Sequence, residues 1–280
     1  MSIKITSDST CDLSQELLAA HGIELFPLSI LKENKAYRDG AEIVPADIFA
    51  HVANGGTLCS TAAVNLADYM LRFGELSRKY DAVIHFDISS EFSSCFQNAR
   101  LASAELPNVY VIDSRSLSTG QGLLVLAAAE MAGAGMEAGE IVRRVREMTE
   151  KVEASFLIDR LDYLKKGGRC SSVAMLGANL LRLRPCIEVS GGKMQVGKKY
   201  RGQFEKCVRE YVTERLTGRM DLDTRRIFIT HTPVPDGVLA AAREAVRACA
   251  DFEEIFETEA GCTVSCHCGP GTLGILFLKK

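Results

Sequence analysis

The sequence predicts an α/β protein with two domains, an N-terminal domain built on a parallel sheet and a C-terminal domain built on a mixed sheet. In the first half of the chain, short apolar runs, polar loops and helical patterns alternate, which is the order expected of a parallel sheet covered by helices. In the second half, Gly191-Gly192 separates two strand-like runs and indicates an antiparallel hairpin. We therefore expect domains at residues 1–152 and 153–280, and residues 56–80 form a stretch that can pack on the second domain.

The elements of the first half are predicted from apolar runs that end in polar clusters and from helix-capping residues. Strands are expected at residues 3–6, 23–30, 82–88 and 109–112, and a hairpin with its tip at Glu33-Asn34. Three helices are expected before the third strand: residues 13–20 with a cap at Asp12, a helix from Pro45 that ends before Gly55-Gly56, and a helix after Asn65. Three more are expected after it: one that contains Phe92, Phe96 and Ala99, one after Ser118, and residues 139–151. In the helix after Asn65, one face is expected to carry Leu66, Tyr69, Met70, Phe73 and Leu76.

The second half shows a different order, in which strands and helices suit a mixed sheet. Strands are expected at residues 154–158, on both sides of Gly191-Gly192, and at residues 227–230, 254–257 and 273–278. Helices are expected at residues 171–183, at residues 204–216 and from Pro235.

The composition is that of a globular protein with a small net negative charge. The chain has 280 residues, of which 47% are hydrophobic and 25% charged, and a formal net charge of −3. Without a basic excess over the whole chain, nucleic acid is not expected as the main partner. No apolar run approaches the roughly 20 residues that cross a bilayer, and the N-terminus has no signal-peptide core. We therefore expect a cytoplasmic protein without an integral membrane segment.

Ten cysteines are scattered through regular-looking elements, in a chain too long to need disulfides. Buried, reduced thiols are the expected state. Cys262, Cys266 and Cys268 have the spacing C-x3-C-x-C, which lacks the paired C-x2-C spacing of a zinc site, so packing is favoured over metal binding. The signatures of a serine nucleophile, a phosphate-binding loop and a dinucleotide site are missing too. We expect no metal and no cofactor.

A basic segment covers residues 160–201. It contains ten basic and two acidic residues, a local charge of +8 in a chain of net charge −3. Such an excess attracts an anionic group or partner, although a solvated surface is the commoner meaning of a charge run. Because Gly167-Gly168 is expected to hold Arg169 on a tight turn, we favour a functional role for Arg169 and Arg201 and solvation for the other cations.

Hydroxyl groups gather at two predicted helix N-termini, where free amides and the helix dipole favour an anion. One group consists of Ser89, Ser90, Ser93 and Ser94, and the other of Ser60 and Thr61. A carboxylate or a phosphate fits the first group. Helix capping alone accounts for one or two of its four serines. The spacing of the serines does not decide between anion binding and capping, and both interpretations stay open. For Ser60-Thr61 taken singly, an N-terminal turn without a ligand is favoured.

His267 precedes a loop rich in glycine, HCGPGTLG, in which the backbone can approach a ligand closely. A lone histidine is usually structural. His267 is a candidate for ligand binding only because of the glycines and the proline that follow it.

Several motifs together resemble the DegV family of bacterial lipid-binding proteins, which includes the fatty-acid-binding subunit of fatty acid kinase. The resemblance runs from end to end. Besides the Ser60-Thr61 pair before a helix, it is carried in order by ITSDSTCDL, ISSEFSSCFQNA, VIDS, LDYLKKGGRCSS, RPCIEVSGGKMQVGKKYRG and HCGPGTLGILF.

The resemblance implies a two-domain α/β protein that buries one long-chain fatty acid in a narrow tunnel between the domains and does not itself catalyse a reaction. A separate ATP-dependent kinase subunit would phosphorylate the bound carboxylate, and contact with a membrane surface would be transient. The carboxylate would be held by Ser60, Thr61 and the serine loop of Ser89, Ser90, Ser93 and Ser94, with Ser93 as the best candidate and His267 close by. Arg169 and Arg201 would dock the kinase subunit or face the acyl phosphate.

The chain departs from the family pattern at Ser94-Cys95, where relatives commonly have Gly-Thr, and at Cys268, where Thr is usual. The second departure raises an alternative function, a stand-alone enzyme that uses Cys268 and His267 on an acyl substrate. Adjacent residues of an extended loop point in opposite directions, which weakens this alternative. A third hypothesis is an interaction protein whose basic face binds another acidic partner.

Overall fold

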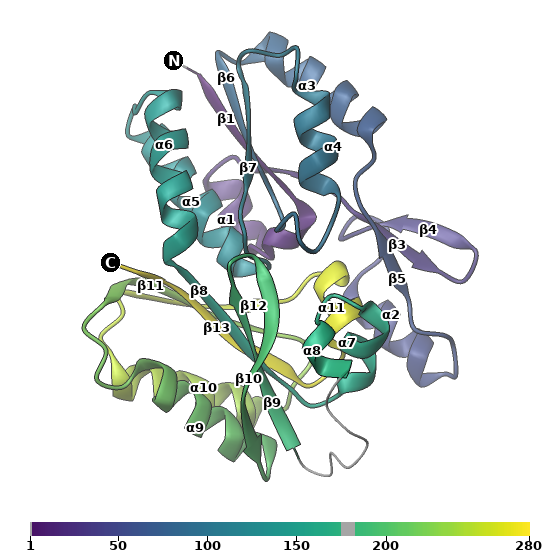
Figure 1. Ribbon diagram of the computed structural model, residues 1–280, viewed down its shortest axis with the longest axis vertical. Coiled ribbons are helices and arrows are strands. Elements are labelled where there is room, and N and C mark those ends of the chain that lie inside the picture. Colours follow the sequence, from purple (N-terminus) through teal and green to yellow (C-terminus); the bar gives the residue numbers. More distant parts are fainter. Residues whose placement is uncertain (1, 175–182) are drawn as a thin grey trace.

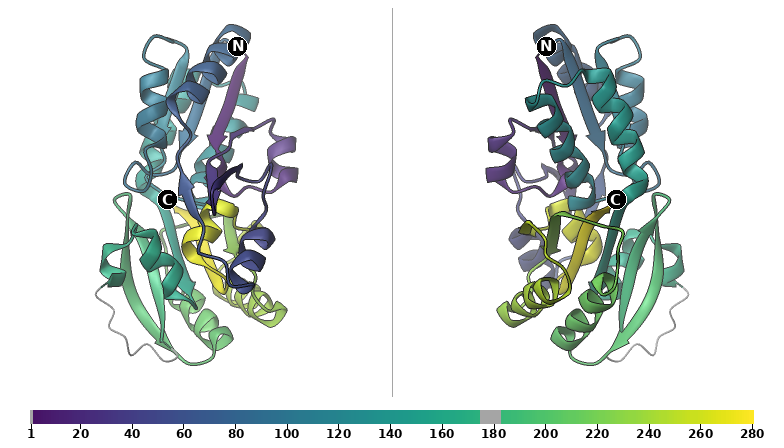
Figure 2. Two further views of the ribbon diagram at one scale, coloured as in Figure 1. Left: turned by 90° about the vertical axis from the view of Figure 1, so that its right-hand side faces the viewer. Right: turned by 90° about the vertical axis from the view of Figure 1, so that its left-hand side faces the viewer.

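The computed structural model describes residues 2–174 and 183–280, and the fold and the sites below refer to these residues. A unit built on a parallel sheet stands above a unit built on a mixed sheet, and the chain crosses between them near residue 152 (Figure 1). The side views show the same two units one above the other, with helices beside the strands of each (Figure 2). The α/β class and the two-domain layout agree with the sequence prediction.

The upper sheet has four parallel strands in the order β2-β1-β6-β7. Its strands are β1 (Ile3–Asp8), β2 (Glu24–Phe26), β6 (Ala82–Asp87) and β7 (Val109–Asp113). Side chains alternate between its faces, so Ile84 packs with helices α1, α5 and α6 whereas Val83 packs with α3 and α4. These helices are α1 (Gln15–Ala20), α3 (Leu66–Lys79), α4 (Cys95–Ala102), α5 (Thr119–Gly133) and α6 (Ala138–Met148), and short 3-10 turns lie at η1 (Ser9–Cys11) and η2 (Thr149–Lys151).

The lower sheet has six strands in the order β10-β9-β8-β13-β11-β12, and all neighbouring pairs except β11-β12 are antiparallel. Its strands are β8 (Val152–Ile158), β9 (Leu183–Ser190), β10 (Lys193–Arg201), β11 (Leu222–His231), β12 (Glu254–Glu259) and β13 (Thr272–Lys279). One face is covered by α9 (Phe204–Leu216) and α10 (Asp236–Cys249). The other face packs against α5, which is apolar all round because it lies between the two sheets.

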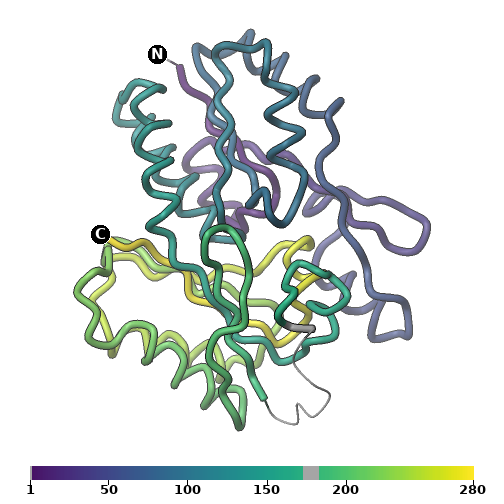
Figure 3. The backbone as a smooth tube through the Cα atoms, in the orientation of Figure 1, coloured from purple at the N-terminus to yellow at the C-terminus, as the bar shows by residue number. Residues whose placement is uncertain are grey.

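A small antiparallel sheet extends from the upper unit toward the lower one. It consists of β3 (Ser29–Lys32), β4 (Lys35–Arg38) and β5 (Ser60–Ala62), and α2 (Pro45–Ala53) connects β4 to β5. Its partner in the lower unit is α11 (Cys262–Cys268), which also packs against α7 (Leu161–Gly167). A last helix, α8 (Ser171–Ala174), follows α7. Figure 3 traces the backbone of this region, in which early and late segments of the chain meet.

Two predictions in the first half were wrong in detail. Residues 23–30 form two strands in different sheets, because Pro27 lies between β2 and β3 and has no N–H to continue a ladder. Helix α1 is capped by Ser14, whose side chain accepts from the N–H of Leu17, and not by Asp12. Asp12 instead follows η1 with a left-handed backbone conformation.

The apolar face of α3 is narrower than predicted, since Leu66 and Met70 are 40% and 58% exposed, whereas Tyr69, Phe73 and Leu76 are buried. Asn65 caps this helix as predicted. Helices α7 and α11 were not predicted, and the residue expected to lie in a loop, His267, is in the last turn of α11. The helix predicted at residues 171–183 is described only for its first four residues, and residues 175–182 lie outside the described part.

Candidate functional site

A pocket lies where the loops of the upper sheet meet β5, the β9-β10 hairpin and α11. The space between its lining atoms is about 540 Å³, including the part that is open to solvent. Its apolar wall includes Leu28, Ile88, Phe92, Leu117, Met194 and Val264. Its polar side chains are Thr61, Ser93, Arg169, Thr263 and His267. A largely apolar wall with a few polar groups suits a ligand that has an apolar body and one polar end.

A second space of about 310 Å³, including the part that is open to solvent, adjoins the pocket. The two spaces are neighbours, since both are lined by Leu117, Val264 and Cys268. The wall of the second space continues between the sheets with Phe156 and Leu276. The linings of the two spaces together extend from the polar side chains of the pocket into the region between the two units.

Thr61 and His267 meet across the pocket. The hydroxyl oxygen of Thr61, on β5, is 2.9 Å from Nε2 of His267, at the end of α11. Burial, with the positive charge of Arg169 in second place, lowers the pKa of His267 to about 4, so its imidazole is neutral at pH 7. Its Nδ1 atom has no hydrogen-bond partner in the described part of the chain and faces Gly167, where a Cβ atom would lie only 2.3 Å away.

The four serines of the loop before α4 have different surroundings. Ser93 lines the pocket, and its hydroxyl donates to the thiol sulfur of Cys95 at 3.2 Å. Ser89 donates to the carbonyl oxygen of Gly192 at 2.7 Å, and Ser90 donates to the carboxylate of Asp113 at 2.6 Å. Ser94 is exposed and its side chain makes no capping bond.

The structure thus brings Thr61, Ser93, Arg169 and His267 to one pocket. Ser60 is exposed at the start of β5 and is not part of the pocket lining, and neither are Ser89, Ser90 and Ser94. Ser89 and Ser90 connect the loop to the hairpin and to the neighbouring strand.

Arg169 and Arg201 occupy different places. Arg169 lines the pocket, where its guanidinium donates to the carbonyl oxygens of Gly167 at 2.7 Å and Phe92 at 3.2 Å. Arg201 ends β10, seven residues after Met194 of the pocket wall. At about 3.3 Å per strand residue this separation is about 23 Å. In this conformation Arg201 therefore lies too far away to touch a ligand at the polar end of the pocket.

Several other cations of the basic segment make ion pairs instead of standing free in solvent. The pairs are Arg160 with Asp162, Arg184 with Asp159, Lys193 with Glu91, and Lys198 with Glu214. Asp162 is already included in the count of +8, but Asp159, Glu91 and Glu214 lie outside the segment, so the count overstates the field of this segment.

The sequence did not single out the residues of the pocket wall that carry no polar group. Leu117, Met194 and Val264 lie on separate elements and look like ordinary core residues in the sequence. Gly167 is the one residue of the sequence that could have indicated how the site packs, because its lack of a side chain leaves room for the imidazole of His267. Periodicity and composition do not distinguish a wall residue from a core residue, because both are apolar and buried.

Cys268 also lines the pocket and is buried. Burial raises the pKa of its thiol to about 12, so the thiol is protonated at neutral pH and is a weak nucleophile. The Nε2 atom of His267 is hydrogen-bonded to the hydroxyl of Thr61. Because both residues lie in a helix, the geometry assumed for an extended loop does not apply, but within residues 2–174 and 183–280 no base is hydrogen-bonded to the thiol.

A further group of side chains suited to a metal ion lies behind Ser93. The ligand atoms of Asp8, Asp87 and Cys95 are all within 4.8 Å of one another, and the three residues are buried. Burial and the charge of Asp87 raise the pKa of Asp8 to about 6.

No helix in the described part of the chain combines the length and the apolar character needed to span a membrane.

These features define a two-domain α/β protein with an apolar pocket between its units and hydroxyl, imidazole and guanidinium groups at the polar end of that pocket. The chain belongs to the DegV family: the sequence profile of a family described as an uncharacterised protein of the DegV family matches residues 2–280.

DegV proteins of several bacteria are similar over the whole chain. The chain is 31% identical to a DegV domain-containing protein of Caldanaerobacter subterraneus, with 99% of both chains covered, and 31% identical to one of Deinococcus radiodurans, with 98% of both covered. Among solved structures, a fatty-acid-binding DegV family protein from Thermus thermophilus superimposes with a TM-score of 0.91 at 29% identity over 100% of both chains. DegV of Bacillus subtilis, described as a fatty acid binding protein, gives 0.83 at 26% identity over 100% of both.

Proposed function

We propose that this protein binds one long-chain fatty acid in the pocket and presents the carboxylate to a separate ATP-dependent kinase subunit for acyl phosphate formation. The observation that supports it most is the arrangement of the pocket, in which a second space with an apolar wall adjoins the one that Thr61, Ser93 and His267 line. The acyl chain would run through both spaces, and we call this proposed route the apolar path. Similar proteins from Thermus thermophilus and Bacillus subtilis are described as binding fatty acids.

The apolar path accounts for the affinity. Burying about 14 methylene groups at about 0.8 kcal/mol each gives a gain of about 11 kcal/mol before the losses of association. The polar groups therefore need to supply orientation more than binding energy. A buried carboxylate must be hydrogen-bonded or paired, which explains why hydroxyls and a basic side chain gather at one end of the path.

The neutral imidazole of His267 defines how the head group is held. When Nε2 carries the proton, it donates to the hydroxyl oxygen of Thr61, and the hydroxyl hydrogen of Thr61 is free to donate to the fatty acid carboxylate. Ser93 lines the same pocket and supplies a second hydroxyl, which would turn from the sulfur of Cys95 to donate to the carboxylate, and Arg169 supplies a positive charge. His267 thus acts by aligning Thr61.

The alternative of a thiol-dependent enzyme is less well supported. Cys268 is part of the lining of both apolar spaces, and burial holds its thiol in the protonated form. A nucleophilic thiol requires a lowered pKa and a neighbouring base.

Native mass spectrometry of the purified protein tests lipid binding directly. We expect one long-chain fatty acid for each chain, released on denaturation. The double substitution Ser93→Ala with His267→Ala should weaken retention, whereas Ser94→Ala, which changes an exposed serine one residue away, should not. A wild-type protein that carries no fatty acid and takes up none when oleate is added would contradict the proposal.

Presentation to a kinase is tested with the kinase subunit, ATP and loaded protein. Arg169→Ala and Arg201→Ala should each keep the fatty acid but slow acyl phosphate formation. Lys199→Ala is the matched control, because Lys199 is an exposed cation on the same strand as Arg201. Equal loss of bound lipid in both arginine variants would mean that they act on binding and not on docking.

A further inference from the structure

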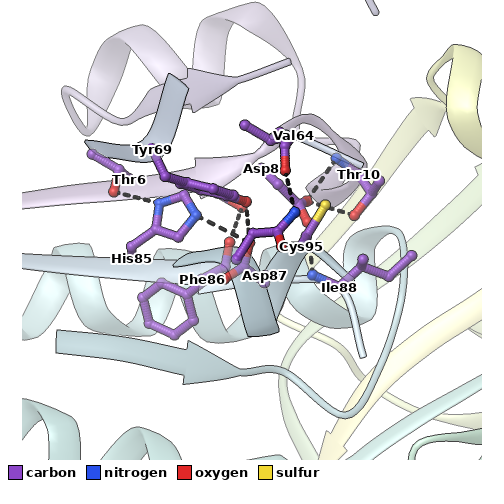
Figure 4. Close-up of polar contacts among 12 residues, drawn as sticks. Thr6, Asp8, Thr10, Val64, Tyr69, His85, Phe86, Asp87, Ile88 and Cys95 are labelled. Carbon is purple, nitrogen blue, oxygen red and sulfur yellow. Dashed lines mark hydrogen bonds and ion pairs between the residues drawn. The ribbon is translucent and has the colours of Figure 1, made fainter. Parts of the chain in front are cut away.

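A second cluster of chemical groups lies at the carboxyl ends of the two central strands of the upper sheet. Asp8 ends β1, Asp87 ends the adjacent strand β6, and Cys95 begins α4. All three side chains are fully buried, and their ligand atoms lie within 4.8 Å of one another. Figure 4 shows the two carboxylates and the thiol converging from these three elements.

The position in the sheet is one at which α/β proteins commonly bind ligands. The strand order is β2-β1-β6-β7, so the chain leaves β1 toward β2 on one side and leaves β6 toward β7 on the other. This reversal between β1 and β6 is a topological switch point, and open α/β sheets bind ligands outside the carboxyl ends of the strands at such a point. Asp8 and Asp87 lie at these strand ends.

The hydrogen bonds of the two carboxylates are unequal. Both oxygens of Asp8 are satisfied: the backbone N–H of Ile88 donates to Oδ2 at 2.8 Å, and Thr10 and Gln121 donate to Oδ1. Asp87 Oδ1 accepts from the hydroxyl of Tyr69 at 2.5 Å and is 3.2 Å from Nε2 of His85.

In contrast, Asp87 Oδ2 is buried and has no hydrogen-bond partner among residues 2–174 and 183–280. A buried carboxylate oxygen without a partner, beside a second carboxylate, is strongly unfavourable unless a cation or a proton compensates it. This free oxygen is the observation that distinguishes the cluster from an ordinary buried ion network.

We propose that Asp8, Asp87 and Cys95 bind a divalent transition metal ion, for which zinc is the best match. One sulfur and two carboxylate oxygens are donors that Zn²⁺ accepts, whereas Mg²⁺ and Ca²⁺ avoid sulfur. The ion would deprotonate the thiol on binding and neutralise the two carboxylates. Asp87 Oδ2 is the atom that gains its missing partner.

The surroundings provide the outer support that metal ligands normally have. His85 fixes the Asp87 carboxylate through Nε2, and its Nδ1 is 2.8 Å from the hydroxyl of Thr6, so the ring cannot turn freely. Ser93 donates to the sulfur of Cys95 and lines the pocket. Ser93 therefore connects the lining of the pocket with the thiol of Cys95 through a direct contact.

The proposal is tested by metal loading of the full chain. The protein is stripped with a chelator, incubated with Zn²⁺ or Co²⁺ and passed through a desalting column, and metal is then counted by mass spectrometry. We expect one tightly held ion per chain, and with Co²⁺ a thiolate-to-metal charge-transfer absorption. Cys95→Ser should lose this absorption, and His85→Gln, which keeps all three ligands but removes the imidazole that supports Asp87, should lower the affinity about tenfold.

Cys186→Ser is the matched control, because Cys186 is another buried thiol but lies on β9 of the lower sheet. This variant should bind metal like the wild type. The proposal is overturned if the wild type retains neither ion, or if the charge-transfer absorption survives in Cys95→Ser. Should Cys95→Ser fail to fold, X-ray absorption spectroscopy of the zinc-loaded wild type decides: one sulfur with oxygen neighbours supports the site, and any other number of sulfurs overturns it.

Discussion

Replacing Gly167 by alanine is expected to weaken fatty acid binding although alanine is the better helix residue. Gly167 ends α7 without a positive φ angle, so alanine can adopt its backbone conformation. In a helix interior, alanine is favoured over glycine by about 1 kcal/mol. Here, however, the added Cβ would lie 2.3 Å from Nδ1 of His267, and the imidazole must move.

The size of the effect follows from the contact that is lost. Moving the ring breaks the 2.9 Å interaction between Nε2 of His267 and the hydroxyl of Thr61. A neutral hydrogen bond contributes about 1 kcal/mol net, and the same amount corresponds to about a fivefold change in a dissociation constant. We therefore expect Gly167→Ala to raise the dissociation constant for oleate about fivefold while the free energy of unfolding without ligand changes by at most about 1 kcal/mol.

Titration of delipidated protein with oleate and urea unfolding measure the two quantities. The double variant Gly167→Ala with His267→Ala is the control, because the clash disappears with the imidazole. It should bind oleate as His267→Ala alone does. Wild-type affinity in Gly167→Ala, or losses that simply add in the double variant, would refute the assignment of Gly167 as the residue that makes room for the ring.

Two further predictions concern stability. Because burial holds the pKa of His267 near 4, below its ordinary value of 6.5, the unfolded chain binds a proton that the folded chain does not. Relative to His267→Gln, the wild type should therefore lose up to about 3 kcal/mol of unfolding free energy as the pH falls from 6.5 to 4; parallel pH profiles in urea unfolding would contradict this. Tyr211→Phe removes a buried hydroxyl that donates to the carbonyl oxygen of Ser155 at 2.6 Å and accepts from the N–H of Ile275 at 3.1 Å. This variant should lose about 2 kcal/mol of unfolding free energy. Tyr110→Phe is the control and should lose little, because the hydroxyl of Tyr110 makes no such bonds in the described chain. Equal urea midpoints of the two variants would show the reasoning to be wrong.

Elements whose determinants are local could be predicted from the sequence. Helix α3 begins where expected because its cap, Asn65, is the residue before it. The β9-β10 hairpin turns at Gly191-Gly192, where both residues have positive φ angles. In each case the physical cause lies within a few residues of its effect.

Helix α11 was missed because its determinants are distant. Its sequence, CTVSCHC, is poor in helix-forming residues. Its first N–H groups are satisfied by carboxylates from the start of the chain: Asp39 accepts from Cys262 and Thr263, and Asp12 accepts from Gly261. Nothing near His267 in the sequence signals this capping, so the residue was assigned to a loop.

In the candidate site, too, features with local causes could be predicted and features with distant causes could not. The polar residues Thr61, Ser93, Arg169 and His267 could be named from motifs, because hydroxyls, a guanidinium and an imidazole stand out in a sequence. Which serines of a cluster face the pocket, and which apolar residues form its wall, depends on how separate elements pack. The Asp8, Asp87 and Cys95 cluster likewise exists only because adjacent strands end together.

The carboxylate caps of α11 also bear on how the protein folds. Asp12 and Gly261 are 249 residues apart in the chain, and Asp39 and Cys262 are 223 apart. Loop-closure entropy opposes such contacts early in folding, and chains dominated by them fold slowly. The pocket should therefore be among the last parts to form, and a polypeptide cut between the two sheets should yield two halves of which neither holds His267 in place.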